Sequence, residues 1–193
     1  MGKHAIKYLT LSAMFLAIGL FLPFFTGQIP HIGMALLPMH LPVLLCGLIC
    51  GWKYGFSIGL IMPIMRSLLF GTPPLLPMAV AMTFELAVYG LVAGFLYGRS
   101  RWQCIIALYK ALLAAMVAGR LVFGAAMAVL SAFVFIPPDG AFTFKMFISG
   151  AIITAWPGIV LQLIFIPVLM VTLKRAGLVH FYREKSEAPE RMG

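Results

Sequence analysis

Residues 39–70, MHLPVLLCGLICGWKYGFSIGLIMPIMRSLLF, hold two apolar segments separated by Trp52 and Lys53. Both segments are short compared with the roughly 20 residues that a helix needs to cross a bilayer. Because only Trp52 and Lys53 join them, the stretch predicts a tight hairpin of two helices, about 39–51 and 54–70. The alternative is one kinked helix that spans both segments.

The rest of the chain is equally apolar. Hydrophobic residues make up 63% of the sequence and charged residues 10%, with a mean hydropathy of +1.06, whereas a soluble domain has about 25% charged residues. Glycine, proline and charged residues divide the chain into predicted helices at about 5–25, 39–51, 54–70, 77–97, 105–135 and 144–173. The sequence therefore predicts an all-α membrane protein with one six-helix transmembrane domain, 1–173, and a tail, 174–193.

The positions of lysine and arginine predict its orientation, because these residues favour short cytoplasmic loops. Six crossings with a cytoplasmic N-terminus place ten of the 14 cations on one side, and the opposite loops, 26–38, 71–76 and 136–143, contain none. Five crossings would move part of this set outside, so six crossings and two cytoplasmic termini are favoured. The ten cations are Lys3, Lys7, Lys53, Arg99, Arg101, Lys174, Arg175, Arg183, Lys185 and Arg191. Since they are spread over separate loops, the net charge of +9 does not indicate a nucleic-acid partner.

Arg66, Glu85 and Arg120 lie within apolar segments, where charged side chains are costly and often functional. Helical rise places all three at a similar depth in the outer half of the membrane, so they should face each other or a shared pocket. An ion pair that only fixes helix packing is one interpretation. One acid cannot neutralise two arginines, however, and the surplus charge favours a ligand carboxylate held by a bidentate arginine. If Arg66 reaches outward past Phe70, a neutral ligand is equally suitable.

Other residues at this level are candidates for the pocket lining: His40, Tyr89 and Trp156, with Gln162 in the last segment. Each alone is more typical of an interfacial or packing role. The loop 26–38 is predicted to act as a lid. Lys110 lies close enough to the cytoplasmic end of its segment to extend its amine to the interface.

No motif of catalysis is present. The chain has a single aspartate and lacks an HExxH sequence, a nucleotide-binding loop and a CxxC pair, so we predict no catalytic residue, metal site or cofactor. Cys46 and Cys50 share one helix face, where small packing residues are expected. A small secondary carrier or channel is the alternative to a subunit that receives its energy from other chains, and uptake by proteoliposomes without partner subunits would favour the carrier.

Several segments resemble the S components, the substrate-binding subunits, of energy-coupling factor (ECF) vitamin transporters. Ala13 and Ala17 form an AxxxA pair in the first segment, as in that family. Residues 36–55, 66–71 (RSLLFG) and 84–90 (FELAVYG) are also similar to the group. The resemblance extends over essentially the whole chain.

This resemblance implies a protein of the bacterial inner membrane that binds a vitamin or related micronutrient from outside. Pantothenate-like, folate-like or nicotinate-like molecules carry the carboxylate that the arginines favour. It also implies that Ala13 and Ala17 contact a membrane coupling (T) subunit, which two cytoplasmic ATPase subunits drive. The family has no fixed ligand motif, so Arg66, Glu85, Arg120, His40, Tyr89 and Trp156 are predicted as site residues from their depth alone.

Overall fold

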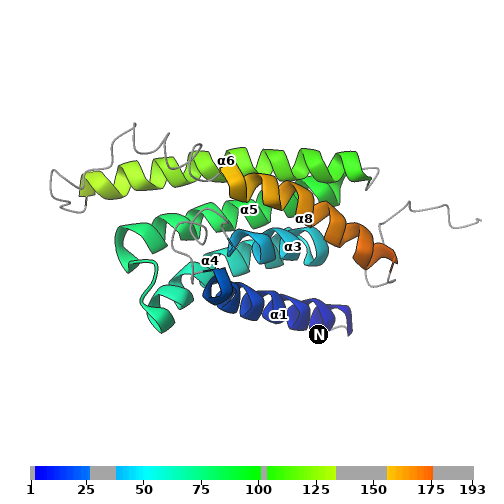
Figure 1. Ribbon diagram of the computed structural model, residues 1–193, viewed down its shortest axis with the longest axis horizontal. Coiled ribbons are helices and arrows are strands. Elements are labelled where there is room, and N and C mark those ends of the chain that lie inside the picture. The colour runs from blue at the N-terminus through cyan, green and yellow to red at the C-terminus, as the bar shows by residue number, and fades with distance from the viewer. Residues whose placement is uncertain (1–2, 27–37, 101–103, 134–155, 176–193) are drawn as a thin grey trace, which may run out of the picture.

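Every regular element that the structure describes is helical. The computed structural model describes residues 3–26, 38–100, 104–133 and 156–175, and these ranges contain no strand. The elements, shown in Figure 1, are α1 (Lys3–Thr26), α3 (His40–Cys50), α4 (Trp52–Phe70), a short π-helix η1 (Leu75–Ala79), α5 (Val80–Arg99), α6 (Ile105–Phe133) and α8 (Trp156–Arg175). The predicted all-α fold is confirmed.

Four helical stretches are long and apolar enough to cross a membrane. By length and composition these are Ile6–Phe24, Leu75–Arg99, Ile105–Ser131 and Trp156–Leu173. α3 is apolar but shorter, and α4 is not among the four. The chain is thus a multi-pass membrane protein, while six crossings and cytoplasmic termini stay predictions. Residues 27–37 of the predicted lid and 144–155 of the last predicted segment lie outside the described residues.

The stretch 39–70 forms two helices that lie against each other. Gly51 alone connects them, with a φ of 98° that ends α3, and its N–H donates to the carbonyl of Gly47 at 3.1 Å. A Cβ atom built on Gly55 would lie 2.6 Å from the Cα of Gly47, so the chain reverses at once. The predicted hairpin is present, but its turn lies at Gly51 and not at Trp52 and Lys53, because glycine adopts this backbone conformation without strain.

Glycines bring α3, α4 and α5 into backbone contact. A Cβ on Gly47 would lie 2.5 Å from the carbonyl oxygen of Gly90, and Gly90 packs in the same way on the backbone of Gly55. Gly59 lies against Leu86 on α5. Such close approach is typical of membrane helices, where small residues let backbones pack tightly. The contacts also set the register: α3 runs parallel to α5, and α4 runs antiparallel to it.

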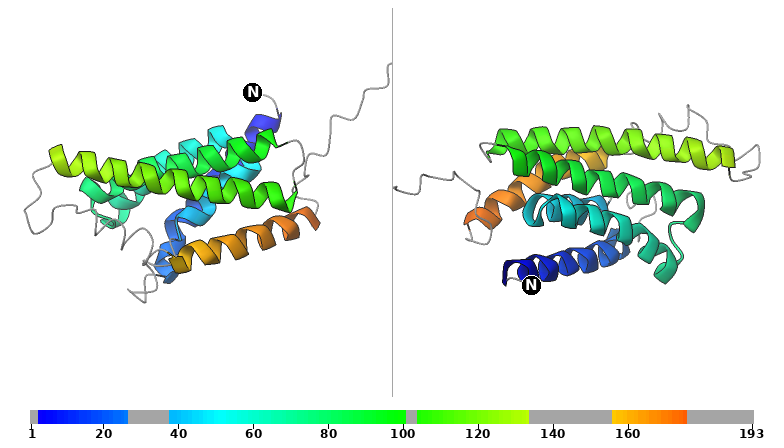
Figure 2. Two further views of the ribbon diagram at one scale, coloured as in Figure 1. Left: turned by 90° about the horizontal axis from the view of Figure 1, so that it is seen from above. Right: turned by 180° about the vertical axis from the view of Figure 1, so that it is seen from behind.

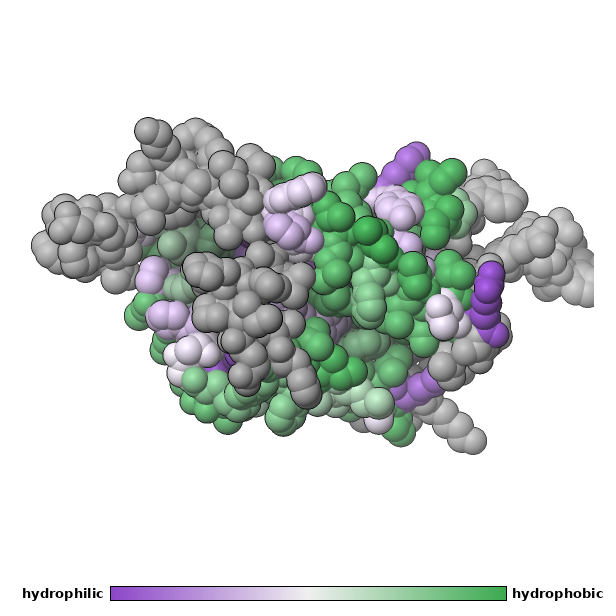
Figure 3. Space-filling model, viewed as in Figure 1, coloured by the Kyte–Doolittle hydropathy of each residue, from purple (hydrophilic) through white to green (hydrophobic). Residues whose placement is uncertain are grey.

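α5 is the central helix of the bundle. It packs against α3, α4 and α6, while α8 contacts α6 and α3. Figure 2 shows α1 and α6 at opposite edges of this arrangement. Much of the visible surface is apolar (Figure 3), and large exposed side chains follow the outer faces of α1 and α6, among them Leu9, Phe21, Leu113, Val117 and Leu121. An apolar surface of this extent suits a protein that lies in lipid.

Candidate functional site

Two buried polar side chains and a half-buried arginine, from three helices, meet beside the start of α3. His40 is the first residue of α3, Glu85 lies near the start of α5, and Arg120 is in the middle of α6. Glu85 Oε1 lies 3.1 Å from Arg120 Nη1 and 3.4 Å from His40 Nε2. The side chains of His40 and Glu85 are only 1% and 2% exposed. We call His40, Glu85 and Arg120 the ion-pair cluster. The structure thus brings together three of the predicted site residues.

Tyr89 closes one side of the ion-pair cluster. It lies one helical turn after Glu85 and is 1% exposed, and its ring meets the His40 ring edge to face, with centroids 5.0 Å apart. The ring also lies on the backbone of α6, because a Cβ on Gly119 would be 2.5 Å from Tyr89 Cε2. Gly119 therefore gives Tyr89 its place beside Arg120. Gly119 was not among the residues predicted for the site, although a glycine next to an intramembrane arginine could have indicated it.

The ion-pair cluster retains hydrogen-bonding groups without partners among the described residues. Nε and Nη2 of Arg120, both ring nitrogens of His40 and Oε1 of Glu85 are buried and make no hydrogen bond there. Nε and Nη2 form one edge of the guanidinium, so Arg120 meets Glu85 with Nη1 and keeps a pair of parallel donors. Such an edge matches the two oxygens of a carboxylate. In the described part of the chain, no three His, Cys, Asp or Glu side chains are grouped to hold a metal ion.

Arg66 points away from the ion-pair cluster. Its Nη1 donates to the carbonyl of Leu20 at 2.7 Å, and its guanidinium lies 5.3 and 5.5 Å from the ring centroids of Phe24 and Phe70. The depth argument placed Arg66 level with Glu85. The register differs: Gly59 packs on Leu86, so in antiparallel helices Arg66, seven residues later, lies beside Ala79. That position is six residues, or about 9 Å, from Glu85 along the chain toward the N-terminal end of α5.

The two remaining candidates on α8 have different surroundings. Trp156 is 62% exposed at the first residue of the helix and takes no part in the ion-pair cluster. Gln162 is 1% exposed, and its Nε2 has no hydrogen-bond partner among the described residues. Gln162 lies one turn before Ile166, which packs in the core with Tyr89. A role of Trp156 in binding stays a prediction.

Ala13 and Ala17 lie on the exposed face of α1. The opposite face is buried: Ser12 Oγ lies 3.5 Å from Cys46 Sγ on α3, and Gly19 packs against Met62 on α4. Small residues therefore lie on both faces of α1, but among these four only Ser12 and Gly19 pack against α3 and α4 in the described part of the chain. The AxxxA pair is left accessible to another chain.

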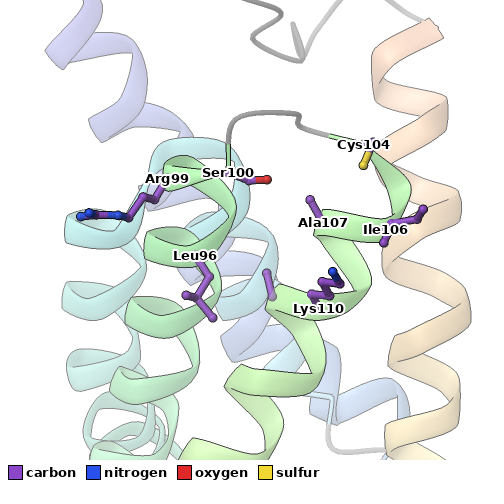
Figure 4. Close-up of a pocket in the computed structure, with 8 residues that line it drawn as sticks. Leu96, Arg99, Ser100, Cys104, Ile106, Ala107 and Lys110 are labelled. Carbon is purple, nitrogen blue, oxygen red and sulfur yellow. The ribbon is translucent and has the colours of Figure 1, made fainter.

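A groove of ≈ 410 Å³ lies between the end of α5 and the start of α6, as Figure 4 shows. Its lining comprises Leu96, Arg99, Ser100, Cys104, Ile106, Ala107, Lys110 and Ala111. Lys110 lies within the groove, whereas Arg99 extends away from it (Figure 4). A hydrogen bond from the backbone N–H of Ala107 lowers the pKa of the exposed Cys104 thiol. Since Lys110 is ten residues, or about 15 Å, from Arg120 along α6, the groove is separate from the ion-pair cluster.

Comparison with known proteins identifies the family. Residues 7–170 match the family model described as "ECF transporter, substrate-specific component". No curated protein and no solved structure matches the chain significantly. The helical fold, the apolar surface and the buried polar cluster agree with the family match, which covers most of the sequence. The chain therefore belongs to the substrate-specific components, or S components, of ECF transporters.

Proposed function

We propose that this S component captures a carboxylate-bearing micronutrient, such as a pantothenate-like molecule, at the ion-pair cluster. S components are substrate-binding membrane subunits and not enzymes, and the ATPase of the transporter lies in other subunits. The substrate is therefore a small molecule that needs a site within the bundle. The ion-pair cluster supports this role because it joins charged side chains from three helices and keeps unpartnered buried polar atoms.

The free edge of Arg120 is the observation on which the carboxylate proposal depends. A buried donor without a partner costs free energy, about 1–3 kcal/mol for a neutral group and more for a charged one. A carboxylate on Nε and Nη2 would remove this cost with two charge-assisted hydrogen bonds. Glu85 would keep its contact with Nη1, so the same guanidinium would bind both acids.

The position of Arg66 changes the charge balance of the ion-pair cluster. With Arg66 outside the ion-pair cluster and beside Phe70, Glu85 balances Arg120, so charge alone suits a neutral ligand equally well. The preference for a carboxylate then follows only from the directions of the free donors. Gln162 offers a further buried amide donor for a carbonyl or hydroxyl oxygen of the same ligand.

Native mass spectrometry of protein purified without added ligand tests this function. We expect a co-purified carboxylate-bearing molecule, and a rise in melting temperature with pantothenate or another acid in a vitamin panel, because a ligand that binds only the folded state stabilises it. Absence of any bound molecule, together with no thermal shift across the panel, would contradict the proposal. A shift with neutral vitamins alone would retain the site but exclude the carboxylate.

Ala13 and Ala17 are proposed to contact the coupling subunit. We expect that Ala13→Leu combined with Ala17→Leu leaves ligand binding unchanged but abolishes co-purification with the T subunit and the ATPases, because leucine prevents close helix approach. Ala125→Leu with Ala128→Leu, on the exposed side of α6, is the matched control and should retain assembly. Full assembly of the α1 variant would place the coupling surface elsewhere.

A further inference from the structure

The outer end of α1 contains a proline that weakens the helix. Pro23 has no N–H, so it cannot donate to the carbonyl of Gly19, and its ring disturbs the preceding turn. At this point Arg66 reaches across from α4, and its Nη1 donates to the carbonyl of Leu20 at 2.7 Å. Arg66 thus donates to the carbonyl next to the one whose usual donor Pro23 lacks, within the turn that the proline disturbs.

Two aromatic rings hold the guanidinium in this position. Phe24 of α1 and Phe70 of α4 pack edge to face, with centroids 4.7 Å apart, and both lie within 5.5 Å of the Arg66 guanidinium. Phe24 lies one turn after Leu20 on α1, and Phe70 lies one turn after Arg66 on α4. Arg66 is 8% exposed although it lies near the end of its helix. Hydrogen bond and cation–π contacts therefore join the last turns of two helices.

We infer that Arg66 is a positioning residue that fastens the outer end of α1 to α4 and does not contact the ligand. The consequence for the site follows from packing. Leu16 and Leu20 of α1 pack against the buried group that contains Met39 and Met62, and Met39 immediately precedes His40. Release of the α1 end would loosen the packing beside His40, and with it the wall of the ion-pair cluster.

The position of α1 can be measured without a ligand. Spin labels at Phe21→Cys on α1 and Val117→Cys on α6, in a Cys104→Ser background, report how far the α1 end lies from the opposite edge of the bundle. Both labelled positions are exposed, at 59% and 61%, and every variant carries the same pair. We expect one narrow distance distribution with Arg66 present, and an added longer-distance population in Arg66→Gln.

Further variants separate this role from a general loss of stability. Arg66→Lys keeps a cation and a donor and should restore most of the narrow population, whereas Phe24→Leu should open the contact in part while leaving Arg66 unchanged. Lys53→Gln, at the other end of α4, should have no effect. Gly90→Ala should lower the melting temperature without moving the α1 label. An unchanged distribution in Arg66→Gln would overturn the inference.

The effect on binding rests on the proposed function, whereas the position of α1 does not. If the label distances change as expected but no vitamin binds, the proposed function fails and the α1 contact stands. If a vitamin binds and the distances do not change, the α1 contact fails alone.

Discussion

Replacement of Arg120 by lysine is expected to weaken ligand binding about 100-fold or more. Lysine keeps a positive charge beside Glu85 but lacks the edge formed by Nε and Nη2. Two hydrogen bonds to a charged group contribute about 1.5–3 kcal/mol each, and each 1.4 kcal/mol corresponds to a tenfold change in affinity. Isothermal titration with the acid identified by native mass spectrometry measures the loss.

Lys110→Gln provides the matched control for Arg120→Lys. Lys110 is a cation on the same helix, it is exposed, and it lies in the separate groove at the start of α6. Its substitution should leave affinity unchanged. An Arg120→Lys variant that melts normally and binds as tightly as the original protein would show that the guanidinium edge is not the carboxylate site.

The second large effect concerns the backbone contact between α4 and α5. A Cβ on Gly90 would overlap the carbonyl of Gly55, which is backbone and cannot move aside like a flexible side chain. We expect Gly90→Ala to reduce the free energy of unfolding by about 1–3 kcal/mol, the usual cost of overpacking. Larger residues such as valine should prevent the helices from packing at all. Thermal unfolding in detergent or reconstituted bilayers measures the change.

Gly98→Ala on the same helix is the control. Among the described residues, no atom beyond the adjoining part of α5 lies within 4 Å of a Cβ at this exposed position. Alanine should therefore increase stability by about 0.5–1 kcal/mol through its higher helix propensity. Equal melting temperatures for the Gly90→Ala and Gly98→Ala variants would mean that the close approach of α4 and α5 does not limit stability.

The candidate site was partly predictable because buried charges in a bilayer must find partners. Glu85 and Arg120 were expected to meet, and they lie 3.1 Å apart. His40 and Tyr89 were individually weak candidates, and both join the contact. Arg66 was placed at the wrong depth, since counting residues from predicted helix ends ignores the offset that packing imposes on neighbouring helices. The spacing of Gly55 and Gly59 was visible in the sequence, but only the structure shows that these glycines meet Gly90 and Leu86 of α5 and so fixes the offset.

The stretch 39–70 shows which features follow from the sequence and which follow only from the tertiary structure. The sequence by itself determined that residues 39–70 form apolar helices of a membrane protein, because composition and hydropathy decide which solvent a segment tolerates. It also showed that the few charged residues in the apolar segments need partners or a function. Only the tertiary structure decided that Gly51 reverses the chain and that Gly47, Gly55 and Gly90 pack backbone to backbone. Register depends on contacts between residues distant in sequence. The register of the packed helices therefore places Arg120 beside Glu85 and Arg66 beside α1.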